Sequence, residues 1–108
     1  MKYDFEKEII DGLLEIFGSS LLRIVLYGSV VRGTDTAESD IDIAIILDSE
    51  MDTGLNEQLV DFSVDLDLKY NRVFSIVDIN NDNFAKWEKT LPFYRNVRDE
   101  GVVLWKVA

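Results

Sequence analysis

Two short segments of this chain contain the residue types that phosphate and metal chemistry need. An apolar run ends in Gly28-Ser29, and after ten intervening residues Asp40 and Asp42 stand two positions apart at the start of a second apolar run. Free backbone amides at the start of a helical turn bind anions, and here a glycine permits close approach while a serine adds a hydroxyl donor. The first segment therefore predicts a phosphate site, although a glycine-serine pair after a strand is also common in ordinary turns.

The second segment indicates a divalent metal. Side chains two apart on a strand point to the same face, with ~7 Å between their Cα atoms. Two carboxylates on one face, here Asp40 and Asp42, repel each other unless a proton or a cation lies between them. The chain has a further Asp-x-Asp at Asp65 and Asp67, which we interpret as part of a solvated helix face.

Composition limits the chemistry further. The 108 residues include no cysteine and no histidine, which excludes thiolate nucleophiles, disulfides and the commonest general base. The 21 acidic residues outnumber the 11 basic ones, for a net charge of −10, and 13 of the acids are aspartates. This balance disfavours nucleic acid as a direct partner and favours hard cations such as Mg²⁺, although acidity also simply maintains solubility.

The chain is predicted to form a single domain, 1–108, of the α/β (α+β) class, with a small mixed sheet of about four strands and helices packed on it. Neither a membrane-spanning run nor the pattern of a signal peptide is present, so we expect a cytoplasmic protein and no membrane partner. Hydrophobic spacing predicts helices over 4–17, 56–70, 83–90 and 92–100, with Asp4 as the first N-cap. The expected strands are 21–27, 41–47, 73–79 and 102–105.

The two segments together resemble the nucleotidyltransferase signature of the DNA polymerase β superfamily, and specifically its minimal single-domain (MNT) branch. The resemblance is detailed from about Leu22 to Leu47 and looser from there to Gly101-Val102. It implies a polymerase β-like nucleotidyltransferase fold and an enzyme that moves a nucleoside monophosphate from an NTP to an acceptor. The positions of this chain that match the motif are Gly28, Ser29, Arg32, Gly33, Ser39, Asp40 and Asp42.

The resemblance also implies roles for these residues. Gly28 and Ser29 would bind the β- and γ-phosphates of ATP, and Asp40 and Asp42 would bind two Mg²⁺ ions, for which Mn²⁺ could substitute. Ser39 fits the nucleotide-binding pattern. Arg32 is equally consistent with a phosphate contact and with a surface ion pair to Asp35 or Glu38.

One position departs from the family pattern. A third carboxylate, serving as metal ligand and general base, is expected on the strand after the second long helix. Alignment of Val73–Ile79 by its apolar pattern places Ser75 there. Asp78 lies three residues further along and would reach the site only through a bulge or a shifted register, because strand alternation points it to the other face. Asp78 is thus a weak candidate for the third catalytic carboxylate.

Three functions follow from the resemblance. In the first, the chain is the antitoxin of a HEPN-type ribonuclease toxin and transfers AMP to that helical partner. The second is a catalytically weak or inactive module that neutralises the same partner by complex formation, which the serine at position 75 favours. The third is transfer to a small molecule. Relatives with that function have an additional helical domain that covers the acceptor, and we expect no such domain in this chain.

The last part of the chain is rich in large apolar residues. Phe93, Val97, Val103 and Trp105 could close the core of this small domain. Alternatively, part of this tail, with Trp87, forms an exposed apolar patch. Such a patch would bind a HEPN-type protein or a second copy of the chain.

Overall fold

A four-stranded mixed sheet in the order β3-β2-β1-β4 forms the centre of the computed structural model, which describes residues 3–108. Its strands are β1 (Leu21–Tyr27), β2 (Ile41–Leu47), β3 (Phe74–Asn80) and β4 (Val102–Lys106). β2 runs parallel to β3, whereas β1 pairs antiparallel with both β2 and β4. The predicted fold class and the four strands are confirmed, and the last strand forms an edge of the sheet as expected.

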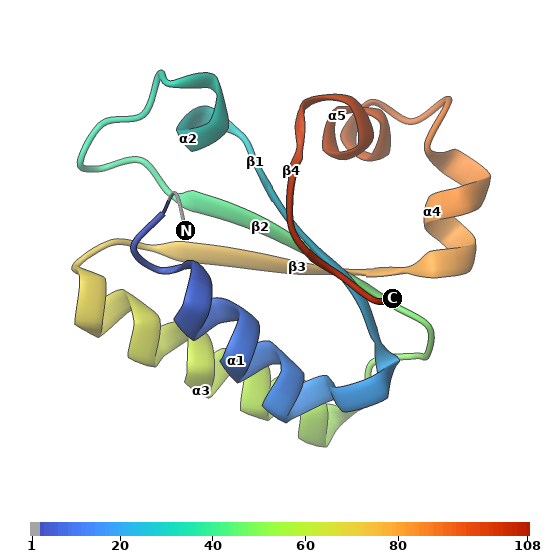
Figure 1. Cartoon of the computed structure of the whole chain (residues 1–108), viewed down its shortest axis with the longest axis horizontal. Helices are drawn as coiled ribbons and strands as arrows, with labels where there is room; N and C mark the ends of the chain where they lie inside the picture. Colours follow the sequence, from blue (N-terminus) through green and yellow to red (C-terminus); the bar gives the residue numbers. More distant parts are fainter. Residues whose placement is uncertain (1–2) are drawn as a thin grey trace.

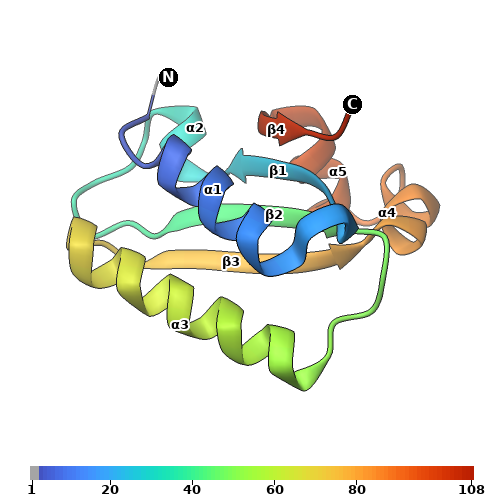
Figure 2. The ribbon, with the colours of Figure 1, turned by 60° about the horizontal axis from the view of Figure 1, so that its bottom comes forward.

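Helices cover both faces of this sheet. On one face lie α1 (Glu6–Phe17), followed by the short 3₁₀ turn η1 (Gly18–Ser20), and α3 (Thr53–Tyr70), as Figure 2 shows. The other face bears α4 (Asn81–Trp87) and α5 (Pro92–Glu100), while the single turn α2 (Ser29–Arg32) follows the end of β1 (Figure 1).

Strand alternation divides the core into two layers. Ile41, Ile43 and Ile45 of β2 point toward α1 and α3, whose buried residues are Ile9, Leu13, Phe17, Leu59 and Leu66. Ala44 and Ile46 point the other way, into a smaller cluster with Phe84 of α4 and Val97 of α5. Asp42 belongs to this second face because it alternates with Ile41 and Ile43, so the candidate site lies on the side of the sheet opposite α1 and α3.

Three helices begin at residues other than those expected. α3 begins at Thr53, since the Asp52 carboxylate accepts a hydrogen bond of 2.7 Å from the Leu55 amide. α1 begins at Glu6 with Phe5 at the N-cap position, so the prediction that Asp4 is the N-cap was wrong.

The tail divides between core and surface. Val97 is buried, and Trp105 packs against the larger core cluster. Phe93 and Val103 remain 39% and 50% exposed, and Trp87, Leu91 and Val102 are exposed as well. The interpretation in which Phe93 and Val103 close the core was therefore wrong. No helix in the part of the chain that the structure describes is long and apolar enough to cross a membrane.

Candidate active site

Gly28, directly after β1, lies against the side chain of Asp42 of β2. Gly28 has φ +82°, a left-handed conformation that L side chains rarely adopt. A Cβ atom at this position would lie 2.3 Å from Oδ2 of Asp42. Glycine is thus required at position 28 for two reasons. The backbone adopts a left-handed conformation, and the Asp42 carboxylate occupies the space that a side chain would fill.

Strand register explains why these residues meet. Tyr27 is the antiparallel partner of Asp42, so the end of β1 and the start of β2 lie at the same end of the sheet. Asp40 precedes β2 by one residue and is exposed, whereas Asp42 is half-buried. The structure therefore brings the glycine-serine turn and the aspartate pair together, as the sequence patterns predicted.

The turn after Gly28 has the form of an anion site. α2 begins at Ser29 and ends at Arg32, followed by Gly33 in the left-handed conformation. The amides of the first helical residues have no partner within so short a helix, and they lie next to the Ser29 hydroxyl. This arrangement can bind phosphate oxygens at the end of the sheet where Asp42 is located.

Burial and the neighbouring Asp40 both disfavour the charged form of Asp42. Burial raises the pKa of Asp42 above its usual value of 3.8, the Asp40 charge raises it further, and Arg32 opposes the shift. The pKa of Tyr27 rises to about 12, mainly because the phenol is partly buried and secondarily because of the Asp42 charge. A divalent cation at Asp40 and Asp42 would relieve this repulsion.

The donor set fits Mg²⁺ bound together with a nucleotide. In residues 3–108 no three carboxylates are clustered so that they could hold a metal by themselves. Magnesium commonly binds through one or two carboxylates, with substrate phosphates and water completing the octahedron. Asp40 and Asp42 would supply the carboxylates. A triphosphate held at the neighbouring turn, together with water, would supply the other oxygen ligands.

Arg32 has a different ionic partner from those considered. Its Nη1 lies 3.3 Å from Oε2 of Glu100, which links α2 to the end of α5. Asp35, by contrast, pairs with Arg72 at 3.5 Å, so the proposed pairing of Arg32 with Asp35 or Glu38 was wrong. The Arg32 side chain is half exposed and close enough to Asp42 to affect its pKa, so it remains available to a phosphate.

Ser39 stabilises the loop before Asp40. Its hydroxyl accepts a hydrogen bond of 2.9 Å from the Thr36 amide, and its carbonyl accepts one of 2.8 Å from Nη2 of Arg72. Sequence reasoning missed Arg72, because no local pattern connects position 72 with a loop more than thirty residues earlier. Ser39 and Arg72 thus position the chain that leads into Asp40.

Ser75, and not a carboxylate, stands beside Asp42 on the neighbouring strand. Ser75 is the parallel partner of Asp42, and pairing between β2 and β3 continues without a bulge as far as Asn80. Asp78 is opposite Ile45, so it lies on the other face of the sheet and does not join Asp40 and Asp42. The structure thus rules out the route by which Asp78 was to reach the site.

Comparison with known proteins agrees with this geometry. The family described as "Polymerase beta, Nucleotidyltransferase" matches residues 10–106. The chain belongs to this nucleotidyltransferase family. A curated relative of Methanocaldococcus jannaschii, named as a candidate protein adenylyltransferase, is 35% identical over 99 residues, which cover 92% of this chain and 93% of the relative.

Solved structures of toxin–antitoxin complexes share the fold of this nucleotidyltransferase. A chain in the crystal structure of a toxin–antitoxin with AMP-PNP matches with a TM-score of 0.65 and 25% identity, covering 94% of this chain and 73% of that one. The complex of a tri-AMPylated Shewanella oneidensis HEPN toxin with its MNT antitoxin matches at 0.60 and 21% identity, covering 94% and 70%. At that identity the second match establishes the fold alone.

Proposed function

We propose that this nucleotidyltransferase moves AMP from Mg-ATP to a hydroxyl group on a HEPN-type toxin, for which it is the antitoxin. The contact between Gly28 and Asp42 is the main support, because it joins a phosphate-binding turn to a metal-binding pair. The name of the Methanocaldococcus relative supports a protein acceptor, and the AMP-PNP complex supports ATP as the donor.

Transfer requires little covalent chemistry from the protein. The acceptor oxygen bonds to the α-phosphorus of ATP, and the bond from that phosphorus to the oxygen bridging it to the β-phosphate breaks. Pyrophosphate leaves with that oxygen, and the proton of the acceptor hydroxyl passes to solvent water. Ser29 and the first amides of α2 hold the β- and γ-phosphates, and Arg32 stabilises the charge that develops on them. Asp40 and Asp42 would hold magnesium, which would supply positive charge to stabilise the negative charge that develops during transfer.

A second function is favoured by one observation. Ser75 stands opposite Asp42 where a third carboxylate would accept the proton of the acceptor hydroxyl, and a neutral hydroxyl is a poor base at pH 7. The same fold would then retain Mg-nucleotide and neutralise its partner by stoichiometric binding.

A labelling experiment separates these two functions. The chain is incubated with a candidate HEPN-type partner protein, Mg²⁺ and ATP labelled at the α-phosphate. Covalent label on the partner, absent with Asp40→Asn/Asp42→Asn, supports the transferase. Neutralisation of the toxin without label supports the binding module.

We predict that Ser75→Asp increases the rate of AMP transfer by about tenfold or more, since general bases contribute typically 10² to 10⁴. Ser75→Asn has a similar size but no basic group, and it serves as the matched control. Initial rates of labelling are compared at equal protein concentration. Equal rates for the aspartate and asparagine variants would contradict a missing-base explanation.

A further inference from the structure

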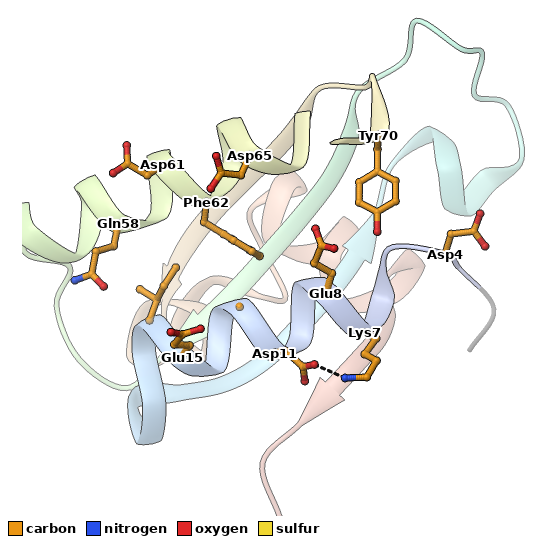
Figure 3. Close-up of a pocket in the computed structure, with 12 residues that line it drawn as sticks. Asp4, Lys7, Glu8, Asp11, Glu15, Gln58, Asp61, Phe62, Asp65 and Tyr70 are labelled. Atoms are coloured by element: carbon orange, nitrogen blue, oxygen red, sulfur yellow. Dashed lines mark hydrogen bonds and ion pairs between the residues drawn. The ribbon is translucent and has the colours of Figure 1, made fainter. Parts of the chain in front are cut away.

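A groove of about 770 Å³ runs between α1 and α3, on the face of the sheet opposite the Gly28–Asp42 contact. Figure 3 shows its two sides: Glu8, Asp11 and Glu15 project from α1, and Asp61 and Asp65 from α3. The groove does not include any residue of the candidate active site. Its role is therefore separate from nucleotide binding.

The floor of the groove is apolar. Phe62 extends from α3 toward α1 (Figure 3), and a Cβ atom at Gly12 would lie 2.2 Å from its ring. Ile16 lines the groove beside them. Phe62 and Ile16 are only partly buried, so apolar surface remains accessible between two acidic rims.

The acidic rims exceed the cations available to balance them. Lys7 pairs with Asp11 at 2.5 Å, and Lys69 pairs with Glu8. Among residues 3–108, Glu15, Asp61 and Asp65 form no ion pair. Asp61 and Asp65 also stand four apart on one helix, a like-charge spacing that destabilises helices by about 0.2–0.5 kcal/mol.

The chemistry of the groove limits what can occupy it. A metal ion is disfavoured because no three carboxylates within the described residues converge on one point, and the groove has no neighbouring phosphate-binding turn through which a nucleotide would supply the missing ligands. Nucleic acid and anionic membranes are repelled by the rims. A ligand that matches the apolar floor and the acidic rims has an apolar stripe that contacts Phe62 and Ile16, with cations on either side of that stripe. These cations would be spaced over the length of α1, which is about 18 Å for its 12 residues.

We propose that the α1–α3 groove is the docking site for a basic amphipathic helix of a partner protein. The apolar stripe of that helix packs on Phe62 and Ile16, and its lysine and arginine side chains pair with Glu15, Asp61 and Asp65. Because the groove and the active site lie on opposite faces, docking does not depend on nucleotide.

The test uses the whole chain and a synthetic 18-residue helical peptide of leucine and lysine, with its leucine and glutamate counterpart as the negative probe. Calorimetry is expected to show one-to-one binding of the basic peptide only. Asp61→Lys/Asp65→Lys is expected to weaken binding by about tenfold or more, because it reverses two charges on one rim. Asp48→Lys/Glu50→Lys makes the same change in net charge on exposed residues outside the groove and is expected to retain near-parental affinity.

Several results would overturn the proposal. Equal weakening by both charge reversals would mean that the peptide responds only to net charge. Retained affinity in Phe62→Ser that still unfolds cooperatively would show that the floor is not used. Dissociation of a peptide-free dimer by Asp61→Lys/Asp65→Lys would assign the groove to a second copy. Binding that persists in Asp40→Asn/Asp42→Asn is expected, so failure of the transferase function does not affect this test.

Discussion

At the scale of single residues, Asp42 experiences two opposing demands. It is packed against Gly28 and half-buried, which disfavours its charge, yet its charge is what a metal requires. Asp40 increases the penalty and Arg32 decreases it. An electrostatic penalty of this kind at one carboxylate is typical of sites that bind a ligand of opposite charge.

We predict that Asp40→Asn/Asp42→Asn weakens binding of Mg-ATP by at least about tenfold, because it removes both carboxylate ligands of the metal. Calorimetric titration with ATP in the presence and absence of Mg²⁺ measures this. Binding of ATP without metal, at the Ser29 turn, is expected to be retained or strengthened, because two negative charges beside the triphosphate are removed. Unchanged Mg-dependent affinity would place the metal elsewhere.

We also predict how Asp42 affects stability with pH. Its pKa is raised in the folded state, so the folded protein binds this proton more tightly than the unfolded chain. The stabilising contribution is thus fully present below about pH 3.8 and is lost as the pH rises through the folded pKa. Asp42→Asn is therefore at least as stable as the parent at pH 7, and its relative advantage in urea unfolding shrinks as the pH falls toward 4.

At this scale the sequence predicted which residues of the candidate site lie near one another, but not the partners of the residues around them. Gly28, Ser29, Asp40 and Asp42 could be grouped because they flank one loop between two strands. The partners of Arg32 and Asp35 could not, because Glu100 and Arg72 are far away in the sequence. Long-range ion pairs follow from packing and leave no local pattern.

At the scale of elements, the positions of the strands could be predicted from the apolar runs in the sequence, whereas their order in the sheet could not. The order β3-β2-β1-β4 depends on which edges pair after the chain has folded. Alternation alone correctly indicated that Asp78 faces away from Asp42, since β2 and β3 pair without a bulge. Asp67 was interpreted as solvated, yet its carboxylate accepts a hydrogen bond of 2.7 Å from the Phe74 amide at the start of β3.

We predict that Asp67→Ala lowers the free energy of unfolding by about 1–3 kcal/mol, because it leaves the partly buried Phe74 amide without its acceptor. Asp65→Ala is the matched control: its side chain is exposed and lies on the same helix, and the expected change is within about 0.5 kcal/mol. Urea unfolding measures both. Equal losses would mean that helix propensity, and not the contact with β3, determines the effect.

At the scale of the whole molecule, net charge determines which partners can approach. At −10 the chain lacks the phosphate-neutralising surface that supplies most nucleic-acid affinity. We predict no measurable binding to RNA or DNA oligonucleotides at physiological salt, as judged by fluorescence anisotropy. Tight binding that weakens steeply with salt would contradict this prediction.

Apolar surface on the tail points to a protein contact at the same scale. The exposed residues come from α4, the N-cap of α5, α5 itself and β4; they are Trp87, Leu91, Phe93, Val102 and Val103. β4 is also an open edge of the sheet. Open edges and exposed apolar patches both favour association with another chain.

We therefore predict that the isolated protein self-associates or co-purifies with its partner through this tail. Val103→Lys places a charge on the edge strand and is expected to lower the mass measured by light scattering at high concentration, or to abolish co-purification. Val64→Lys, at a position 47% exposed on α3 on the other face, is the control and is expected to leave association unchanged. A stable monomer at high concentration that also retains no partner in a pull-down would contradict the assignment of the tail as an interface. Loss of association in both variants would instead indicate that added charge alone separates the chains, because only Val103 belongs to the edge strand.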